Sequence, residues 1–168
     1  MAVCPPRPLL ESDHRELFDC GRESLNGWFR CHAWINHQSG ASRVNVMIDS
    51  ASGRIAGYVT LNAAQIERGF LPKPQQRNQP DPLPATLLGQ LAVDKVFQKQ
   101  GHAVSLLQFA LKTAIHAADS VGSVGVVTHP LDEEVRGFHA RWGFQDLPFD
   151  ARRAMFVRMA DLRKAFRS

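Results

Sequence analysis

Residues 20–39 carry a repeating pattern of apolar positions separated by three and four residues, which is the period of an α-helix. The stripe consists of Leu25, Trp28, Phe29, His32 and Ile35. Ser24 stands just before it and is a residue type that caps helix N-termini. The pattern therefore predicts an amphipathic helix that begins at about Ser24.

Two runs rich in valine and isoleucine follow, residues 43–48 and 54–61, joined by a short polar segment that ends in Gly53. This arrangement predicts a β-hairpin. Residues 67–86 then hold five of the ten prolines. Proline lacks the backbone donor that a helix interior or a central strand needs, so we expect a long loop there.

The second half of the chain alternates between short apolar runs and helical stripes. It predicts a strand, a helix, a strand, a helix and a last strand at residues 87–93, 103–118, 124–127, 131–141 and 155–159. Gly143 is placed to stop the second of these helices. The whole order, a helix, a hairpin, a long loop and then alternating elements, predicts an α/β domain with a mixed sheet.

Length and cysteine content narrow the class of protein. The 168 residues suit one domain over residues 1–168, and no apolar run approaches the ~20 residues of a membrane helix. The N-terminus lacks the pattern of a secretory signal. Three cysteines without a C-x-x-C pair, Cys4, Cys20 and Cys31, argue against a disulfide scaffold or a zinc ribbon and favour a reducing cytoplasm.

The net charge of +4 is unevenly distributed. The C-terminal segment 150–168 contains six basic and two acidic residues, whereas the rest of the chain is balanced. A basic end on a neutral body suits a polyanionic partner such as a nucleic acid. A solvated, positively charged chain end would give the same composition.

The segment from Leu91 to Ala103 carries the strongest local signal for chemistry. A buried strand leads into a short turn with Gly101, and a long helix follows. Such an arrangement directs backbone N–H groups and the positive end of a helix toward one point, which suits a phosphate group. The pattern predicts an anion site without specifying the anion. The P-loop, the G-x-G-x-x-G fingerprint, the H-E-x-x-H metal motif and the G-x-S-x-G nucleophile elbow are all absent from the sequence.

Gln98-Lys99-Gln100-Gly101-His102-Ala103 resembles the (R/Q)-x-x-G-x-(G/A) pyrophosphate loop of GCN5-related N-acetyltransferases, the GNAT family. Residues 138–144, Phe-His-Ala-Arg-Trp-Gly-Phe, resemble the F-Y-x-x-(F/W)-G-F segment of the same family. The two matches occur in the family's order and spacing. The resemblance implies the GNAT fold, a mixed sheet flanked by helices, and acetyl-CoA as cofactor.

Phe18-Asp19-Cys20-Gly21 followed by Leu25-Asn26-Gly27-Trp28 is similar to the opening motif of one subgroup, the acetyltransferase toxins of type II toxin–antitoxin modules. Residues 57–61 and 130–133 also resemble that subgroup. This similarity implies acetylation of the α-amino group of aminoacyl-tRNA, which blocks translation. It further implies a ribbon-helix-helix antitoxin, contact with DNA only through that antitoxin, no membrane partner, and a homodimer.

The resemblance assigns roles by position. The pantetheine arm of the cofactor would pair with the backbone of Leu91, Ala92 and Val93. The pyrophosphate would lie on Gln98, Lys99, Gln100, Gly101, His102, Ala103 and Val104, with Phe138 nearby. The RNA backbone would contact Lys99, Arg68, Lys73, Arg77, Arg152, Arg153, Arg163 and Lys164. No metal site is implied.

His139 departs from the family pattern. It occupies the position where the family has a tyrosine that protonates the departing thiolate, and the chain's only tyrosine is Tyr58. The helical spacing from Val135 predicts that His139 points toward the sheet. We therefore expect cofactor binding with reduced transfer, arising either from natural divergence or from a detoxifying substitution.

Two alternatives to an aminoacyl-tRNA acetyltransferase remain open at this point. The first is an enzyme of the same class that acts on a small amine or a protein N-terminus. The second is a catalytically weak module that binds acetyl-CoA and an antitoxin, which His139 favours. The basic C-terminal segment and the Cys20-Gly21 opening favour the RNA substrate over the first alternative.

Overall fold

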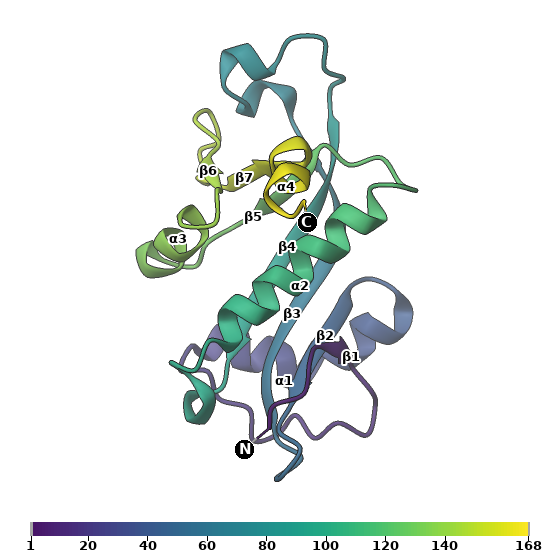
Figure 1. Ribbon diagram of the computed structural model, residues 1–168, viewed down its shortest axis with the longest axis vertical. Helices are drawn as coiled ribbons and strands as arrows, with labels where there is room; N and C mark the ends of the chain where they lie inside the picture. The colour runs from purple at the N-terminus through teal and green to yellow at the C-terminus, as the bar shows by residue number, and fades with distance from the viewer. Residues whose placement is uncertain (1, 168) are drawn as a thin grey trace. The chain divides into compact units, whose positions relative to one another are not determined.

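The computed structural model describes residues 2–167 and, within them, arranges the strands in one seven-stranded sheet with the order β1-β2-β3-β4-β5-β7-β6 (Figure 1). The strands are β1 Arg7–Pro8, β2 Arg43–Ile48, β3 Ile55–Ile66, β4 Leu83–Val93, β5 Gly125–Thr128, β6 Gln145–Asp146 and β7 Met155–Arg158. The α-helices are α1 Glu23–Ser39, α2 His102–Ala117, α3 Glu133–Ala140 and α4 Met159–Ala165. The short 3₁₀ helices are η1 Arg68–Phe70, η2 Lys73–Gln75 and η3 Lys95–Phe97.

The sheet is mixed, as the sequence predicted. β4 and β5 run parallel, with Thr86 opposite Val126, whereas β1 and β2, β2 and β3, β5 and β7, and β6 and β7 pair antiparallel. A parallel pair requires a crossover connection, and α2 lies within that connection. The predicted alternation of elements in the second half of the chain is thereby confirmed.

The chain divides into two compact units. Unit 1 comprises residues 1–62 and 89–110, and unit 2 comprises residues 63–88 and 111–168. β3, β4 and α2 each contribute residues to both units.

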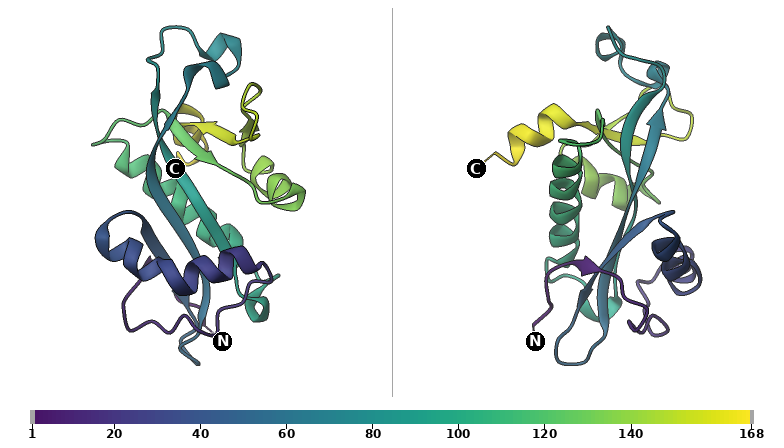
Figure 2. Two further views of the ribbon diagram at one scale, coloured as in Figure 1. Left: turned by 180° about the vertical axis from the view of Figure 1, so that it is seen from behind. Right: turned by 90° about the vertical axis from the view of Figure 1, so that its right-hand side faces the viewer.

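In unit 1, α1 covers one face of the strands and the first turns of α2 cover the other, which Figure 2 shows from the side. Tyr58 and Phe29 are fully buried at the centre of the α1 face, where their rings stack with centroids 4.2 Å apart. Gly57 lies beneath α2, where a Cβ atom would come within 2.9 Å of Leu106 Cδ1. The absence of a side chain at Gly57 therefore allows α2 to pack closely on the sheet.

The buried face of α1 differs from the predicted stripe. The buried residues are Asn26, Phe29 and Ala33, while Ile35 is 62% exposed. His32 is exposed too, and Ser24 lies inside the first turn because the helix begins at Glu23. The side chain of Asn26 accepts from Cys20 N–H at 2.8 Å and donates to the Asp19 carboxylate at 2.9 Å. A polar residue is therefore buried against the segment before the helix, while Ile35 stays exposed.

The predicted loop at residues 67–86 is shorter than expected, because β4 begins at Leu83. Proline is tolerated at position 84 because this residue contributes its carbonyl, and not an N–H donor, to the neighbouring segment of the sheet. Pro84 O accepts from the N–H of Val124, just before β5, at 2.9 Å. The remainder of the loop folds into η1 and η2. Strands β1 and β6 and helix α4 were not predicted, since two-residue strands carry no period and α4 begins at Met159 within the expected last strand.

Unit 2 has its own apolar core. Leu83, Val127, Leu147 and Phe156 are buried together in it, and Leu162 of α4 is also buried. Among residues 2–167, no helix combines the length and apolar character that crossing a membrane would require.

Candidate active site

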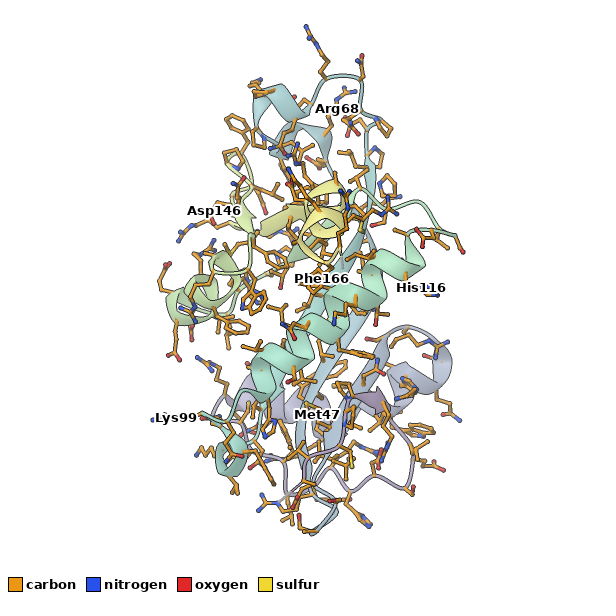
Figure 3. All side chains as sticks on the ribbon, in the orientation of Figure 1. Met47, Arg68, Lys99, His116, Asp146 and Phe166 are labelled. Atoms are coloured by element: carbon orange, nitrogen blue, oxygen red, sulfur yellow. The ribbon has the colours of Figure 1, made fainter. Side chains whose placement is uncertain are left out.

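The predicted anion loop connects β4 to α2 in unit 1. Strand β4 ends at Val93, η3 follows, and α2 begins at His102. Lys99 and Gly101 both have positive φ, 64° and 87°, and these two left-handed residues reverse the chain within four positions. The side chain of Lys99 points outward from the loop (Figure 3).

The start of α2 presents unpaired backbone donors. Ser105 N–H donates to Gly101 O at 3.1 Å, so the amides of His102, Ala103 and Val104 precede the hydrogen-bond ladder of the helix and have no intrahelical acceptor. No acidic residue occupies the first turn. A Cβ atom on Gly101 would meet nothing within 4 Å. Open space in front of free amides at a positive helix end is what a pyrophosphate requires.

The strand that leads into this loop is largely buried, and one of its backbone carbonyls is already hydrogen-bonded to a side chain. Ala92 and Val93 are buried and Leu91 is partly so, which confirms the predicted buried strand. Val93 O accepts from the Gln98 side chain at 2.8 Å. Its carbonyl therefore already has one partner, and pantetheine pairing would use the remaining backbone groups of the segment.

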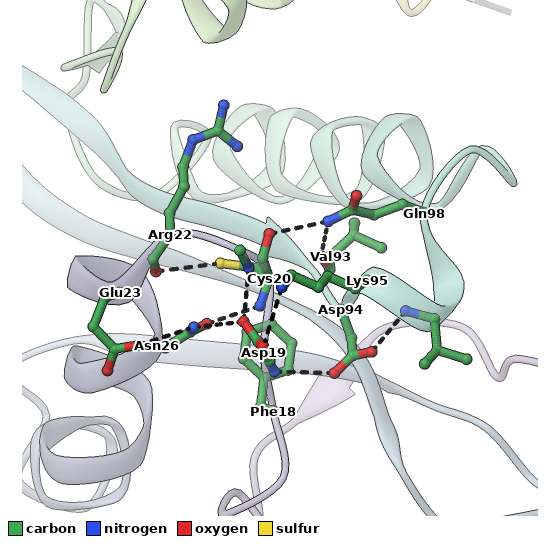
Figure 4. A network of polar contacts seen from close by, with 12 residues as sticks. Phe18, Asp19, Cys20, Arg22, Glu23, Asn26, Val93, Asp94, Lys95 and Gln98 are labelled. Carbon is green, nitrogen blue, oxygen red and sulfur yellow. Dashed lines mark hydrogen bonds and ion pairs between the residues drawn. The ribbon is translucent and has the colours of Figure 1, made fainter.

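The anion loop is tied to the segment that precedes α1 by the polar network of Figure 4. Its central member is Asp94, which is 1% exposed and accepts from Asp19 N–H at 3.0 Å and Val96 N–H at 2.9 Å. In the sequence, the Phe18–Gly21 motif indicates only a family resemblance, and these contacts were not predicted. The partners are distant in sequence, so no local pattern indicates them.

Tyr58 offers no replacement for the missing family tyrosine. It is fully buried, and its hydroxyl lies 2.7 Å from Gln90 Oε1 and 2.9 Å from Leu25 O. Burial raises the pKa of Tyr58 well above its ordinary value. The hydroxyl is thus a structural group of the unit 1 core.

His139 lies in α3 of unit 2, a helix that Asp132 caps by accepting from Val135 N–H at 2.9 Å. The imidazole is 2% exposed and contacts the rings of Phe138 and Phe144 edge-on, with centroids 5.4 and 5.1 Å away. Its expected inward orientation is consistent with this burial. Nδ1 is buried and has no hydrogen-bond partner among residues 2–167.

Burial lowers the pKa of His139 to about 4. The apolar surroundings, among them the rings of Phe138 and Phe144, penalise the charged imidazolium. The side chain is therefore neutral at pH 7 and carries a single N–H. A neutral imidazole can donate one proton, but it is a weaker acid at this position than an imidazolium would be.

The eight predicted RNA-binding side chains fall into two groups. Four contact partners within their own unit: Arg68 with Gln79 O, Lys73 with the Phe149 ring, Arg153 with Glu133 and Arg163 with Asp119. The other four, Lys99, Arg77, Arg152 and Lys164, have no side-chain partner within residues 2–167. Exposed ion pairs such as those of Arg153 and Arg163 contribute little to stability, so a ligand could displace them at small cost. The side chains of the second group are available to a ligand without any such exchange.

Two further features define what the described residues can do. Residues 2–167 contain no cluster of three or more metal-ligating side chains. A polar hollow of about 200 Å³ in unit 2 is lined by Gln75, Gln145 and Asp146 among others, and none of the predicted site residues lines it.

The model of the acetyltransferase (GNAT) family matches residues 8–144. The chain belongs to this family. The resemblance read from the anion loop and from residues 138–144 is thereby confirmed, as is the prediction of an acetyltransferase.

Individual relatives agree with the narrower resemblance to the toxin subgroup. A tRNA-acetylating toxin of Mycobacterium tuberculosis (strain ATCC 25618 / H37Rv) is 34% identical over 158 residues, which cover 94% of this chain and 93% of the relative. The structure of AtaT complexed with acetyl-methionyl-tRNAfMet matches with a TM-score of 0.89 and 28% identity, over 98% of this chain and 99% of the other. The structure of AtaTR bound with AcCoA matches with a TM-score of 0.83 and 28% identity, over 96% of each chain.

Proposed function

We propose that this chain is an acetyl-CoA-dependent N-acetyltransferase toxin that acetylates the α-amino group of aminoacyl-tRNA and so blocks translation. The observation that carries the proposal is the anion loop of the GNAT family, Gln98–Val104, with its free amides and open space before Gly101. The relatives named above, a tRNA-acetylating toxin and AtaT with a bound acetylated tRNA, support the substrate.

The cofactor supplies an acetyl thioester when bound. The amides of residues 99–104 would hold its pyrophosphate, and the backbone of Leu91, Ala92 and Val93 would align its pantetheine arm. These contacts use main-chain atoms, so the buried side chains of the strand still pack in the core. They orient the cofactor without changing its reactivity.

His139 is the candidate catalytic residue. At the position of the family's tyrosine, it holds one proton on a neutral imidazole, and its Nδ1 is not committed to a neighbour among the described residues. In the role that the family resemblance assigns to this position, His139 would give this proton to the leaving sulfur. Phe138 beside it contributes an apolar wall. The neutral state of His139 favours the second candidate function, a module that binds acetyl-CoA and antitoxin but transfers acetyl slowly.

On the nucleic-acid side, Lys99, Arg77, Arg152 and Lys164 would contact phosphates directly. Arg68, Lys73, Arg153 and Arg163 would do so after exchanging their present partners. The resemblance further supports one domain over residues 1–168, a ribbon-helix-helix antitoxin that mediates any DNA contact, a homodimer and a cytoplasmic location. The unpaired state of Cys4, Cys20 and Cys31 agrees with the last of these.

The decisive experiment is transfer of labelled acetyl from acetyl-CoA to a mixture of charged tRNAs. We expect label on the aminoacyl-tRNA and none on uncharged tRNA, since the acceptor is the α-amino group. Label on free amino acids or on peptides alone would assign the chain to a small-amine or protein N-terminal acetyltransferase. Binding of acetyl-CoA and antitoxin without transfer would favour the weak module.

A further inference from the structure

The Phe18–Gly21 segment marks the toxin subgroup in the sequence, but the proposed reaction gives it no role. In the structure this segment lies against the start of the anion loop, to which it is joined by one backbone–backbone hydrogen bond and one backbone–carboxylate hydrogen bond. Lys95 N–H donates to Asp19 O at 2.9 Å, and Asp19 N–H donates to the Asp94 carboxylate at 3.0 Å. The segment therefore extends the support of the loop beyond β4.

Asp94 is the buried anchor of this support. In addition to the two amides that it accepts, it faces the Arg54 guanidinium at 3.4 Å. A buried carboxylate with two amide donors and one cation is well satisfied. It fixes where the chain leaves β4.

Gln98 completes the support from the loop side. Its side-chain Nε2 donates to Val93 O at 2.8 Å and to Cys20 O at 3.1 Å (Figure 4). A primary amide has two N–H donors, so both are used inside the protein. The Gln98 side chain has no donor left for a ligand.

We propose that Gln98 is a positioning residue, which fixes the pyrophosphate loop by tying its first residue to β4 and to the Cys20-Gly21 turn. This inference rests on the proposed acetyl-CoA site. With the first residue held, the amides of residues 99–104 converge before the ligand arrives, and binding costs less ordering of the loop. The turn itself needs glycine at position 21, where φ is +91° and a Cβ atom would lie 3.3 Å from Lys95 Cε.

The test compares substitutions that keep or remove the two donors. Gln98→Met has a similar length and no donor, and we expect it to weaken acetyl-CoA binding by about 10- to 100-fold, as the loss of two hydrogen bonds of roughly 1 kcal/mol each implies. Gln98→Arg keeps planar N–H donors and should restore most of the affinity. Gln38→Met and Gln38→Arg are matched controls, since Gln38 is an exposed residue of α1 that lies outside the pyrophosphate loop.

Calorimetry gives the dissociation constant of acetyl-CoA, and steady-state kinetics show whether a substitution changes KM or kcat. A positioning role raises KM for acetyl-CoA and leaves kcat at saturating cofactor near that of the parent. Hydrogen exchange of residues 99–104 without cofactor should accelerate in Gln98→Met. Equal affinities for Gln98→Met and Gln38→Met, or no recovery in Gln98→Arg relative to Gln38→Arg, would overturn the inference. A parent that does not bind acetyl-CoA would refute the proposed function instead.

A second, independent observation concerns the loop between β6 and β7 in unit 2. Phe149 at this loop is 53% exposed, and Lys73 Nζ lies 5.7 Å from its ring centroid. The loop is ordered from within, because the buried Asp150 carboxylate accepts from Arg152 N–H and Ala154 N–H at 3.0 Å each. An exposed aromatic ring is thus presented on a fixed backbone beside the cation of Lys73, and the exposed Arg152 follows three residues later in the same loop.

We infer that Phe149 stacks on an unpaired base of the RNA substrate, while Lys73 and Arg152 contact the adjoining phosphates. This inference also rests on the proposed function. Proteins that bind single-stranded nucleic acid combine aromatic stacking with cationic contacts to the backbone, and a charged tRNA ends in unpaired nucleotides. The cations beside the ring favour an anionic partner over an apolar one.

Stacking and charge can be separated by salt. Phe149→Ala should weaken tRNA binding by about 10-fold without changing the slope of log K against log salt, whereas Arg152→Ala should reduce that slope by about 0.7–0.9. Phe149→Trp should retain binding. Leu131→Ala is the control, since Leu131 is 51% exposed in the same unit. Unchanged tRNA affinity in Phe149→Ala, or a loss of antitoxin binding only, would overturn the stacking inference. A parent that binds no tRNA would refute the proposed function.

Discussion

The anion loop of unit 1 and the β6–β7 loop of unit 2 are built by the same device. Each has a buried aspartate that accepts two backbone amides, Asp94 in the first and Asp150 in the second. Each also places a non-glycine residue in the left-handed region, Lys99 with φ 64° and Arg153 with φ 56°. The local construction of the two loops is therefore alike.

The loops differ in what they present. The anion loop presents main-chain amides and leaves space around Gly101, while the Lys99 side chain points outward and the Gln98 side chain is bonded inward. The β6–β7 loop presents side chains, above all Phe149 and Arg152. Binding by the first should depend on backbone shape, and binding by the second on side-chain identity.

The largest expected effect follows from filling the space before the anion loop. Gly101→Asp should abolish acetyl-CoA binding, because its carboxylate would occupy the space and repel the phosphates. Gly53→Asp is a matched control. Gly53 also has positive φ, 73°, and open space around a Cβ atom, so it carries the same backbone strain away from the loop. Calorimetry that shows unchanged affinity in Gly101→Asp would place the cofactor elsewhere.

His139 extends the contrast between backbone and side-chain function, because the proposed acetyl transfer depends on a single donor group of this side chain. We expect His139→Tyr to raise kcat on aminoacyl-tRNA by about 100-fold, since a positioned general acid contributes about 10²–10⁴-fold. KM for acetyl-CoA should stay the same, because the loop is untouched. Growth arrest without antitoxin should strengthen in parallel. A parent as fast and as toxic as the tyrosine variant would show that the imidazole is an equally good acid.

The same contrast explains how far the sequence was informative. The anion loop could be predicted because strand, glycine and helix are neighbours in the chain and act through the backbone. The pairing of Arg163 with Asp119, or of Gln98 with Cys20, could not, since those partners are 44 and 78 residues apart. Helix α1 was predicted but its buried face was not, because Asn26 is buried by hydrogen bonds to Asp19 and Cys20 that an apolar pattern does not indicate.

His139 differs from the anion loop also in that its protonation should make the folding stability depend on pH. Its pKa of about 4 in the folded protein lies below the ordinary 6.5, so the unfolded chain binds more protons between these values. Folding stability should then be complete above pH 6.5 and decline as pH falls toward 4, by about 2 kcal/mol at pH 5.

His139→Tyr should lose this part of the pH dependence. Urea unfolding of parent and variant at pH 7.5 and pH 5 isolates it, because titrations common to both proteins cancel. An equal loss of stability in the two proteins between these pH values would show that His139 is not buried in its neutral form.

The smallest effect concerns two neighbouring cations on α4. Lys164 has no side-chain partner within the described residues, whereas Arg163 donates to Asp119 at 3.2 Å. If α4 contacts the RNA backbone, Lys164→Gln removes a free charge and should reduce the slope of log K against log salt by about 0.7–0.9, a loss of a few-fold at moderate salt. Arg163→Gln should have a smaller effect, since its charge is already partly neutralised and it must give up an exposed ion pair to reach a phosphate.

Fluorescence titration of a charged tRNA over a salt series measures the slopes of both variants, and acetyl-CoA affinity should be equal in the two variants. Equal slopes for parent, Lys164→Gln and Arg163→Gln would remove α4 from the RNA surface and leave its charge to the antitoxin or to solvent.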